Sequence, residues 1–266
     1  IIISADRSII NNYKSNNMNT NATLEQMKEL RLSGMALTYS QQLELPIHQQ
    51  LDAHELVAQL IQSEQLSRQQ EKTTYYLKLA KLRLNAIPEQ ISCSATRNLT
   101  RQQLVTLLEG HYLKQGENIL VTGATGCGKS YLACALGYQA CQMGMKTTYF
   151  SMNRFIEKIT LSKLDGSYLK LLNHLERQAL IILDDFGLQP MQQDVKLALL
   201  QILEERQGKR STLVTSQLPV SAWHEYVHEP TVADAIMDRM TANAHRIELK
   251  GESRRKTKNK PAEITA

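Results

Sequence analysis

The sequence has few cysteines, no long hydrophobic run and only a small excess of positive charge. Its four cysteines, Cys93, Cys127, Cys134 and Cys141, show neither metal-ligand spacing nor a redox C-x-x-C pattern, so we expect reduced thiols. Cys134 and Cys141 are predicted to be small core residues. No apolar run approaches the length of a membrane span and no secretory signal is evident, so we expect a cytoplasmic protein without a membrane partner. The net charge of +5 does not by itself indicate a nucleic-acid partner.

The most informative stretch runs from Gly123 to Ser130 and fits the phosphate-binding pattern G-x-x-x-x-G-K-[ST]. A short apolar run precedes it at 118–122 and a segment with helical spacing follows from Tyr131, which is the strand, loop and helix context that the motif requires. Its glycines let the backbone wrap around phosphate oxygens, and the helix N-terminus adds a partial positive charge. We expect Lys129 to reach the β- and γ-phosphates of ATP and Ser130 to ligate Mg²⁺. The predicted nucleotide contacts are Gly123, Ala124, Thr125, Gly126, Cys127, Gly128, Lys129, Ser130 and Tyr131.

A second motif is the apolar run that begins at Leu180 and ends in the carboxylates Asp184 and Asp185. A continuous apolar run predicts a central parallel strand that is buried on both faces. Its carboxyl end is expected beside the phosphate loop, where open α/β sheets bind their ligands. Asp184 is therefore predicted to hold Mg²⁺ together with Ser130, and Asp185 to orient or deprotonate the attacking water. The alternative for this motif alone is a strand end followed by a turn.

The chain divides by composition into an N-terminal helical part and a C-terminal α/β part. Residues 1–17 are polar and are expected to be a disordered extension foreign to the fold. Residues 18–92 are predicted to form a small all-α domain for DNA or partner binding, with Asp52 as a candidate helix N-cap. Pro88 and the polar run 92–98 indicate a linker and a domain boundary.

A basic segment near the end of the helical part is a candidate DNA-binding surface. Its cations are interleaved with Tyr75 and Tyr76, and a basic face with aromatic residues suits phosphate contact and base stacking. The alternative is a solvated helix face whose tyrosines pack on the core. The candidate DNA-binding residues are Arg68, Lys72, Lys78, Lys81 and Arg83.

Residues 93–250 alternate between predicted helices and strands. Strands are predicted at 118–122, 147–151, 180–184 and 211–216, and helices at 100–108, from Met152 onward and at 194–206. This order predicts an α/β fold of the P-loop NTPase type, a parallel sheet with helices on both faces. No helix-turn-helix or zinc site is evident, so any DNA binding is expected to show little sequence preference.

From residue 18 to residue 256 the sequence resembles the IstB-like ATP-binding proteins of bacterial insertion sequences, relatives of the DnaC helicase loader within the AAA+ ATPases. The resemblance implies an ATPase that uses ATP and Mg²⁺ and releases ADP. It further implies a homo-oligomer on double-stranded DNA that helps a transposase in target-site selection. The segments that carry it are the phosphate loop, 181–187, 215–219, 223–224, 233–239 and 243–253.

The same resemblance assigns roles to residues outside the two motifs. Gln217 matches the polar sensor position that contacts the attacking water or the γ-phosphate, with Ser216 as the alternative. Arg239 matches the arginine finger that one subunit presents to the nucleotide of the next, and Arg246 is a second candidate. The alternative for Arg239 is a surface ion pair with Asp238 or Asp234. A finger in trans would make hydrolysis depend on assembly.

Other functions remain open at this point. One is a DnaC-type replicative helicase loader, and another is a scaffold on which ATP binding alone drives assembly. A small-molecule P-loop kinase is disfavoured by the helical N-terminal part and by the Asp184–Asp185 pair. The basic tail 251–266, with Arg254, Arg255, Lys256, Lys258 and Lys260, is expected to be disordered and either to add salt-dependent DNA affinity or to act as a solubilising tail.

Overall fold

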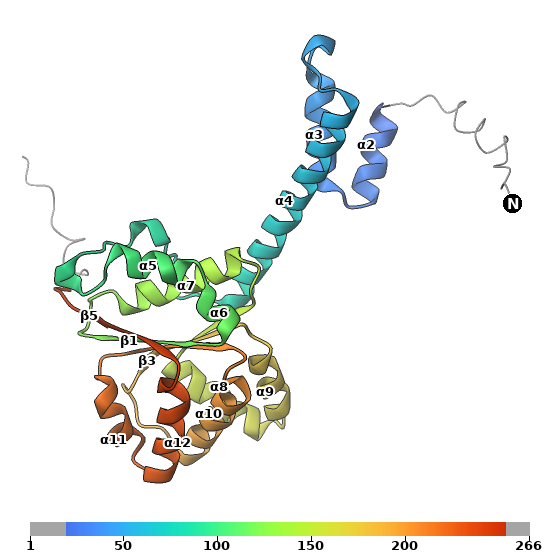
Figure 1. The fold of residues 1–266 in the computed structure, drawn as a ribbon. Coiled ribbons are helices and arrows are strands. Elements are labelled where there is room, and N and C mark those ends of the chain that lie inside the picture. Colours follow the sequence, from blue (N-terminus) through green and yellow to red (C-terminus); the bar gives the residue numbers. More distant parts are fainter. Residues whose placement is uncertain (1–19, 254–266) are drawn as a thin grey trace, which may run out of the picture. The chain divides into compact units, whose positions relative to one another are not determined.

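The computed structural model describes residues 20–253, which divide into two compact units between Lys72 and Thr73 (Figure 1). The predicted extension 1–17 and the cationic residues from Arg254 onward lie outside the described residues. None of the helices in the described part of the chain combines the length and the apolar character that a membrane crossing requires.

The N-terminal unit is helical, as predicted. It contains α2 (Thr20–Glu29), α3 (Ser33–Glu44), the short 3-10 turn η1 (Ile47–Gln49) and the first part of α4 (Ala53–Ala80). Asp52 caps α4, because its Oδ1 accepts the backbone N–H groups of His54 at 2.8 Å and Glu55 at 2.9 Å. The predicted N-cap is thus confirmed.

Close packing joins α3 to α4. A Cβ atom at Gly34 would lie 2.4 Å from the carbonyl oxygen of Ser63, so only glycine fits at this crossing. The buried Glu64 carboxylate accepts the backbone N–H groups of Gly34 and Met35 and the Nε–H of Arg68. Burial alone would raise the pKa of Glu64, but these hydrogen bonds and the Arg68 charge lower it. A side chain from α4 therefore caps the N-terminus of α3.

The second unit is built on a five-stranded parallel sheet in the order β2-β3-β4-β1-β5. The four predicted strands are confirmed, whereas the fifth strand, β5, was missed because its buried and exposed residues alternate at the sheet edge. The strands are β1 (Asn118–Gly123), β2 (Thr147–Ser151), β3 (Leu180–Phe186), β4 (Ser211–Ser216) and β5 (Ala244–Leu249).

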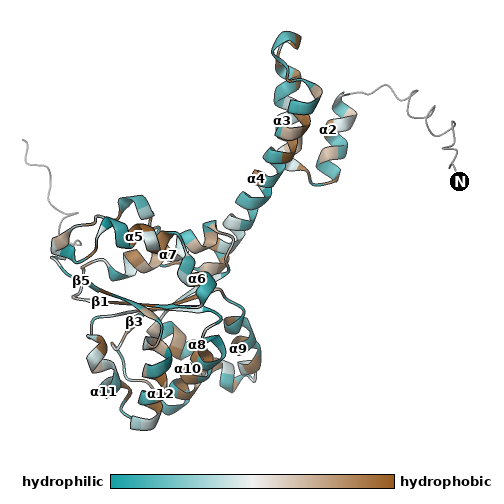
Figure 2. Ribbon diagram, viewed as in Figure 1, coloured by the Kyte–Doolittle hydropathy of each residue, from teal (hydrophilic) through white to brown (hydrophobic). Residues whose placement is uncertain are grey.

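Helices cover both faces of this sheet, which confirms the predicted architecture (Figure 1). Successive β1 residues enter opposite cores, with Ile119 and Val121 on one face and Leu120 on the other. Figure 2 shows hydrophobic residues along α7 and α8, one helix on each face. The first face carries α5 (Arg101–Leu108), α6 (His111–Gln115) and α7 (Lys129–Gln142). The second carries α8 (Met152–Leu164), α9 (Tyr168–Glu176), α10 (Gln193–Arg206), α11 (Trp223–Val227) and α12 (Pro230–Thr241).

The segment that we predicted to be a linker packs into the second unit. Ala86, Ile91 and Leu99 are buried in the first-face core, together with residues of α7. Cys134 is fully buried in the same core and Cys141 is fully buried as well, which confirms both as core residues. The structure therefore divides the chain ahead of the boundary that Pro88 and the polar run suggested, because apolar residues directly before and after this run belong to the core.

Candidate active site

The phosphate loop connects β1 to α7 at the carboxyl edge of the sheet. Gly126 and Gly128 have φ angles of 84° and 102°, a region that favours glycine and that is typical of loops whose backbone N–H groups surround an anion. Lys129 is 6% exposed, and its Nζ donates to the carbonyl oxygens of Gly123 at 2.8 Å and Ala124 at 2.9 Å. The ammonium is thus held inside the loop, where a phosphate would sit.

The acidic end of β3 meets this loop. Ser130 Oγ donates to Asp184 Oδ1 at 3.0 Å, and Asp184 is fully buried. Tyr149 of β2 donates to Asp184 Oδ2 at 2.6 Å, and Thr215 of β4 donates to Oδ1. Burial and the neighbouring Asp184 carboxylate raise the pKa of Tyr149, so this hydroxyl keeps its proton and acts as a donor. Hydroxyl groups from three elements therefore converge on one buried carboxylate.

The oxygen atoms of Ser130 and Asp184 suit a hard divalent cation. Mg²⁺ commonly takes one or two protein oxygens and completes its octahedron with phosphate oxygens and water. Within residues 20–253 no cluster of three or more His, Cys, Asp or Glu side chains has the geometry to enclose a metal. This pair fits a metal that arrives with a nucleotide.

Asp185 has a different setting from its neighbour. Its φ angle is 66°, in the left-handed region, and the pairing of β3 with β4 shifts register between Leu183 and Phe186. Its backbone N–H donates to Thr215 Oγ1 at 3.1 Å. Its carboxylate pairs with the Arg83 guanidinium at 3.2 Å, and the same guanidinium lies 3.7 Å from Asp184.

The two sensor candidates differ in their contacts. Gln217 Oε1 accepts the hydroxyl of Thr125, a phosphate-loop residue, at 2.7 Å. Ser216 is fully buried, donates to the Phe186 carbonyl at 2.6 Å and accepts the Leu218 N–H. Gln217 thus lies at the phosphate loop, whereas Ser216 is engaged in the turn that follows β4.

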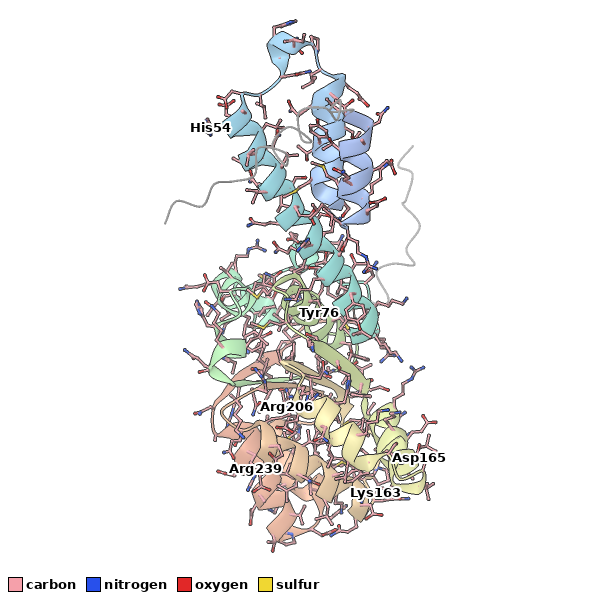
Figure 3. All side chains as sticks on the ribbon, turned by 90° about the vertical axis from the view of Figure 1, so that its right-hand side faces the viewer. His54, Tyr76, Lys163, Asp165, Arg206 and Arg239 are labelled. Carbon is pink, nitrogen blue, oxygen red and sulfur yellow. The ribbon has the colours of Figure 1, made fainter. Side chains whose placement is uncertain are left out.

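Arg239, labelled in Figure 3, lies in the last turn of α12. Its backbone carbonyl accepts the Asn118 side chain at the amino end of β1. Its guanidinium pairs with Glu204 of α10 at 2.9 Å, which differs from the predicted alternatives Asp238 and Asp234. The six residues of β1 span about 17 Å, so Arg239 is remote from its own phosphate loop. Arg246 lies exposed on β5.

The candidate DNA-binding residues fall in both units. Arg68 and Lys72 belong to the N-terminal unit, where Arg68 forms an ion pair with Glu64 at 2.7 Å. The other three, Lys78, Lys81 and Arg83, belong to the second unit. Sequence reasoning did not anticipate that Arg83 contacts the acidic pair.

Residues outside the motif brace the phosphate loop. Arg97 Nη2 donates to the Cys127 carbonyl at 2.8 Å, and Tyr131 donates to Gln90 at 2.9 Å. Ser253, at the end of the described chain, lies so close that a Cβ at Gly126 would meet its hydroxyl at 2.2 Å. The missed residues Arg97, Tyr149 and Thr215 are polar side chains beside the two motifs in space, and a search for hydroxyl groups on the neighbouring strands could have found the last two.

This combination of sheet order and phosphate loop is that of a P-loop NTPase fold of the AAA+ type. The fold resembles the DnaC helicase loader, with a TM-score of 0.55 and 17% identity over 64% of this chain and 100% of that one. It also resembles AMPPCP-bound DnaA from Aquifex aeolicus, with a TM-score of 0.55 and 20% identity over 70% of this chain and 58% of that one.

Residues 25–262 match the family model of the IstB-like ATP binding proteins, and the chain belongs to this family. One relative is y4pL of Sinorhizobium fredii, designated an insertion sequence ATP-binding protein; it is 40% identical over 90% of this chain and 97% of its own length. Another is the ATP-binding protein of insertion sequence IS1162 of Pseudomonas fluorescens, which is 37% identical over 77% of this chain and 89% of its own length.

Proposed function

We propose that this protein is a DNA-stimulated ATPase that assists the transposase of an insertion sequence. It hydrolyses ATP to ADP and phosphate, oligomerises on double-stranded DNA with little sequence preference, and acts with the transposase in target-site selection. The main support for ATPase activity is the 3.0 Å hydrogen bond between Ser130 and Asp184, which joins the two motifs. The role in transposition is supported by relatives that match over most of their length and are named for insertion sequences.

In this proposal the loop from Gly123 to Tyr131 binds the nucleotide. Lys129 exchanges the loop carbonyls for the β- and γ-phosphates, which are stronger acceptors because they are charged. Ser130 and Asp184 would hold Mg²⁺, whose charge, when it is bound, offsets the negative charge that develops on the phosphate oxygens. Tyr149 and Thr215 hold the Asp184 carboxylate in place for this task.

Asp185 and Gln217 act on the attacking water. Asp185 accepts the proton of the water, and Gln217 donates a side-chain N–H to the γ-phosphate or orients the water. The carboxylate of Asp185 is one methylene shorter than that of glutamate, which is the more common residue at this position of AAA+ proteins. Because water positioning is sensitive to reach, we expect slow basal hydrolysis.

Arg239 completes the site of a neighbouring subunit. Its position near the amino edge of the sheet supports action in trans, because its own phosphate loop lies at the carboxyl edge. A guanidinium at the γ-phosphate stabilises the charge that is spread over the transition state. Hydrolysis then requires assembled subunits, and DNA raises the rate by increasing their local concentration.

The test measures ATP turnover and ATP-dependent sedimentation of the full chain, alone, with duplex DNA and with single-stranded DNA. We expect duplex DNA to stimulate turnover and to produce a large complex that forms only with ATP. Lys129→Ala serves as the inactive control. Absence of hydrolysis under all three conditions would contradict the ATPase proposal and favour a passive scaffold.

A second function is distinguished by the same experiment. The fold is shared with the DnaC helicase loader. Stimulation by single strands alone would favour a replicative helicase loader over a transposition helper. The transposase role is tested separately by adding the transposase of an insertion sequence and comparing target-site choice in the presence of wild-type protein and of Lys129→Ala.

A further inference from the structure

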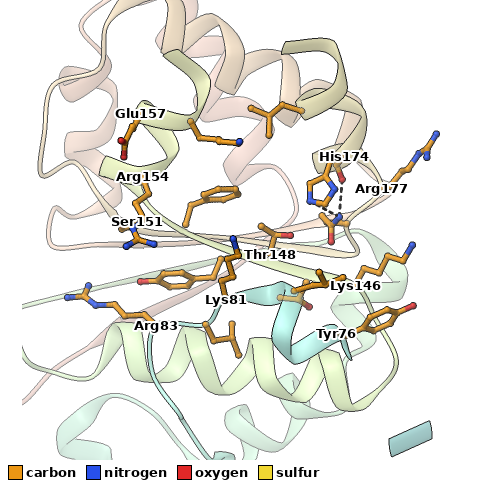
Figure 4. Close-up of a pocket in the computed structure, with 18 of the residues that line it drawn as sticks. Tyr76, Lys81, Arg83, Lys146, Thr148, Ser151, Arg154, Glu157, His174 and Arg177 are labelled. Atoms are coloured by element: carbon orange, nitrogen blue, oxygen red, sulfur yellow. Dashed lines mark hydrogen bonds between the residues drawn. The ribbon is translucent and has the colours of Figure 1, made fainter. Parts of the chain in front are cut away.

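A large groove runs along the edge strand β2, and Asp185 forms part of its lining. Its volume is about 1630 Å³. Its walls come from β2, from α8 and α9, and from residues 75–83 of the second unit. Figure 4 shows Lys81 and Arg83 on one side of the sheet, with Arg154 and His174 on the other. The groove exceeds the roughly 300–1,000 Å³ of small-molecule sites, so its size suits a polymer better than a single nucleotide.

The groove is strongly basic. Seven cations line it against the two carboxylates Glu157 and Asp185. Among the described residues, Arg83 is the only one of these cations that forms an ion pair. Partial burial together with nearby Lys146 and Lys158 lowers the pKa of His174, which reflects the same positive field. The lining cations are Lys81, Arg83, Lys146, Arg154, Lys158, Lys170 and Arg177.

The distribution of these cations favours a phosphodiester backbone. They come from several elements and line the whole groove, whereas a site for one phosphate would bring them to one point. Charges spaced along a path match a strand that carries one phosphate per nucleotide. Tyr75 and Tyr76, with ring centroids 6.0 Å apart, line the same groove and offer aromatic faces beside it.

Arg83 connects this groove to the candidate active site. It lines the groove, and its guanidinium contacts both Asp185 and Asp184. The side chains of Arg83 and Asp185 are 49% and 27% exposed, so solvent reaches this ion pair and a nearby phosphate can compete for the guanidinium. While the pair persists, a carboxylate oxygen of Asp185 is occupied by Arg83 and is not free to bind water.

We propose that the groove binds the phosphodiester backbone of DNA and that Arg83 couples this binding to Asp185. DNA phosphate draws the guanidinium away from Asp185, and the carboxylate then becomes free to orient water. Arg83 is a positioning residue in this scheme. The coupling rests on the proposed ATPase function, whereas DNA binding in the groove does not.

The first experiment measures DNA affinity without nucleotide, using a labelled 30-base-pair duplex and a single strand of the same length over a range of salt concentrations. The double variant Arg154→Gln/Lys158→Gln is expected to weaken binding at least about tenfold and to reduce the salt dependence by nearly two counterions. The matched control, Lys114→Gln/Lys209→Gln, removes two exposed cations outside the groove. Equal effects of the two double variants would overturn the groove as the DNA site. The preferred strand type identifies the form of DNA that binds.

The second experiment addresses the coupling. Arg83→Gln is expected to raise ATP turnover without DNA severalfold and to bring DNA stimulation close to onefold, whereas Arg83→Lys retains most of the stimulation. Unchanged stimulation in Arg83→Gln would overturn the coupling. If wild-type protein binds DNA in the groove but hydrolyses no ATP, the proposed function fails while the groove assignment stands.

A third measurement is independent of hydrolysis and of the folding of Arg83 variants. Asp185→Asn weakens the same ion pair from the other side, so Arg83 becomes available to DNA. By thermodynamic reciprocity, Asp185→Asn is expected to bind DNA about twofold to fivefold more tightly at low salt. Unchanged affinity would contradict the competition between phosphate and Asp185 for Arg83.

Discussion

The two ends of β1 differ in what they hold. At the carboxyl end, hydrogen bonds link Ser130 to Asp184 and Thr125 to Gln217 within one chain. At the amino end, Asn118 contacts the backbone of Arg239, and the Arg239 guanidinium is paired with Glu204. The first group has the side chains that a phosphate and metal site needs, whereas the second contains a cation at the opposite edge of the sheet.

With this arrangement, one reaction can be divided between copies of a chain. The residues proposed to bind ATP all lie at the carboxyl edge, so a single copy is expected to bind nucleotide. The residue proposed to stabilise the transition state lies near the amino edge, where it is proposed to serve another copy. Binding and hydrolysis should therefore respond differently to variants at the two edges.

The largest effect is expected from Arg239→Ala. Arginine fingers contribute roughly 10³-fold or more to turnover, so hydrolysis should fall by about that factor while ATP affinity is retained. Mixing Arg239→Ala with Lys129→Ala subunits should restore part of the activity, because each supplies what the other lacks. Arg246→Ala is the comparison variant. Failure of the mixture to recover activity would break the division between the edges.

Asp185→Asn comes next. General bases contribute about 10²- to 10⁴-fold, so turnover in the presence of DNA should fall by at least about 100-fold with little change in ATP affinity. The measurement is single-turnover hydrolysis at saturating ATP, which separates chemistry from binding. Equal rates in the variant and the wild type would remove Asp185 from the carboxyl-edge group.

Lys129→Ala is expected to weaken ATP binding at the carboxyl edge without affecting the amino edge. Hydrogen bonds to charged groups contribute about 1.5–3 kcal/mol, which corresponds to roughly 10- to 150-fold in ATP affinity. Titration of a fluorescent ATP analogue measures the change. Arg239→Ala should leave this affinity unaltered, and a loss in Arg239→Ala as large as in Lys129→Ala would show that the two edges are not separate.

Glu204→Gln should have the smallest effect. It removes the ion pair that links Arg239 of α12 to Glu204 of α10. Exposed ion pairs contribute only about 0–1 kcal/mol, so the protein concentration at the midpoint of assembly should shift by at most about fivefold. Asp194→Asn, which removes the partner of Lys163 elsewhere on α10, is the matched control. Sedimentation with ATP and duplex DNA measures the midpoint of assembly. A midpoint that moves equally in both variants would indicate a general charge effect.

Sequence reasoning found the parts of the site that are contiguous in the chain. The phosphate loop and the acidic end of β3 are local patterns with a physical meaning, and the structure brings Ser130 and Asp184 together as the motifs predict. Tyr149 and Thr215 were missed because their contacts with Asp184 depend on strand pairing, which places β2 and β4 on either side of β3. Arg83 was assigned only to DNA, since no local pattern relates it to Asp185.

The fold was predictable to a similar depth. Apolar runs identified four central strands, but β5 is half exposed and carries charged residues such as Arg246 and Glu248, so its pattern is weak. The domain boundary was placed late because proline and polar residues at 88–98 suggested a linker. In the structure, Ile91 from this stretch and Leu99 directly after it are buried in the same core as residues of α7, and such burial is a tertiary property.

The strand order also determines when a newly made chain acquires its site. In the described sheet, β1 pairs with β4 and β5, both of which follow it far along the chain. At about 5–20 residues per second, the ribosome needs roughly 5–20 seconds to pass from Gly123 to Ser216. During this interval β1 has no neighbour in the sheet, and Thr215 is not yet present to hold Asp184. A product truncated before β4 is thus expected to bind no ATP and to leave assemblies of intact copies undisturbed.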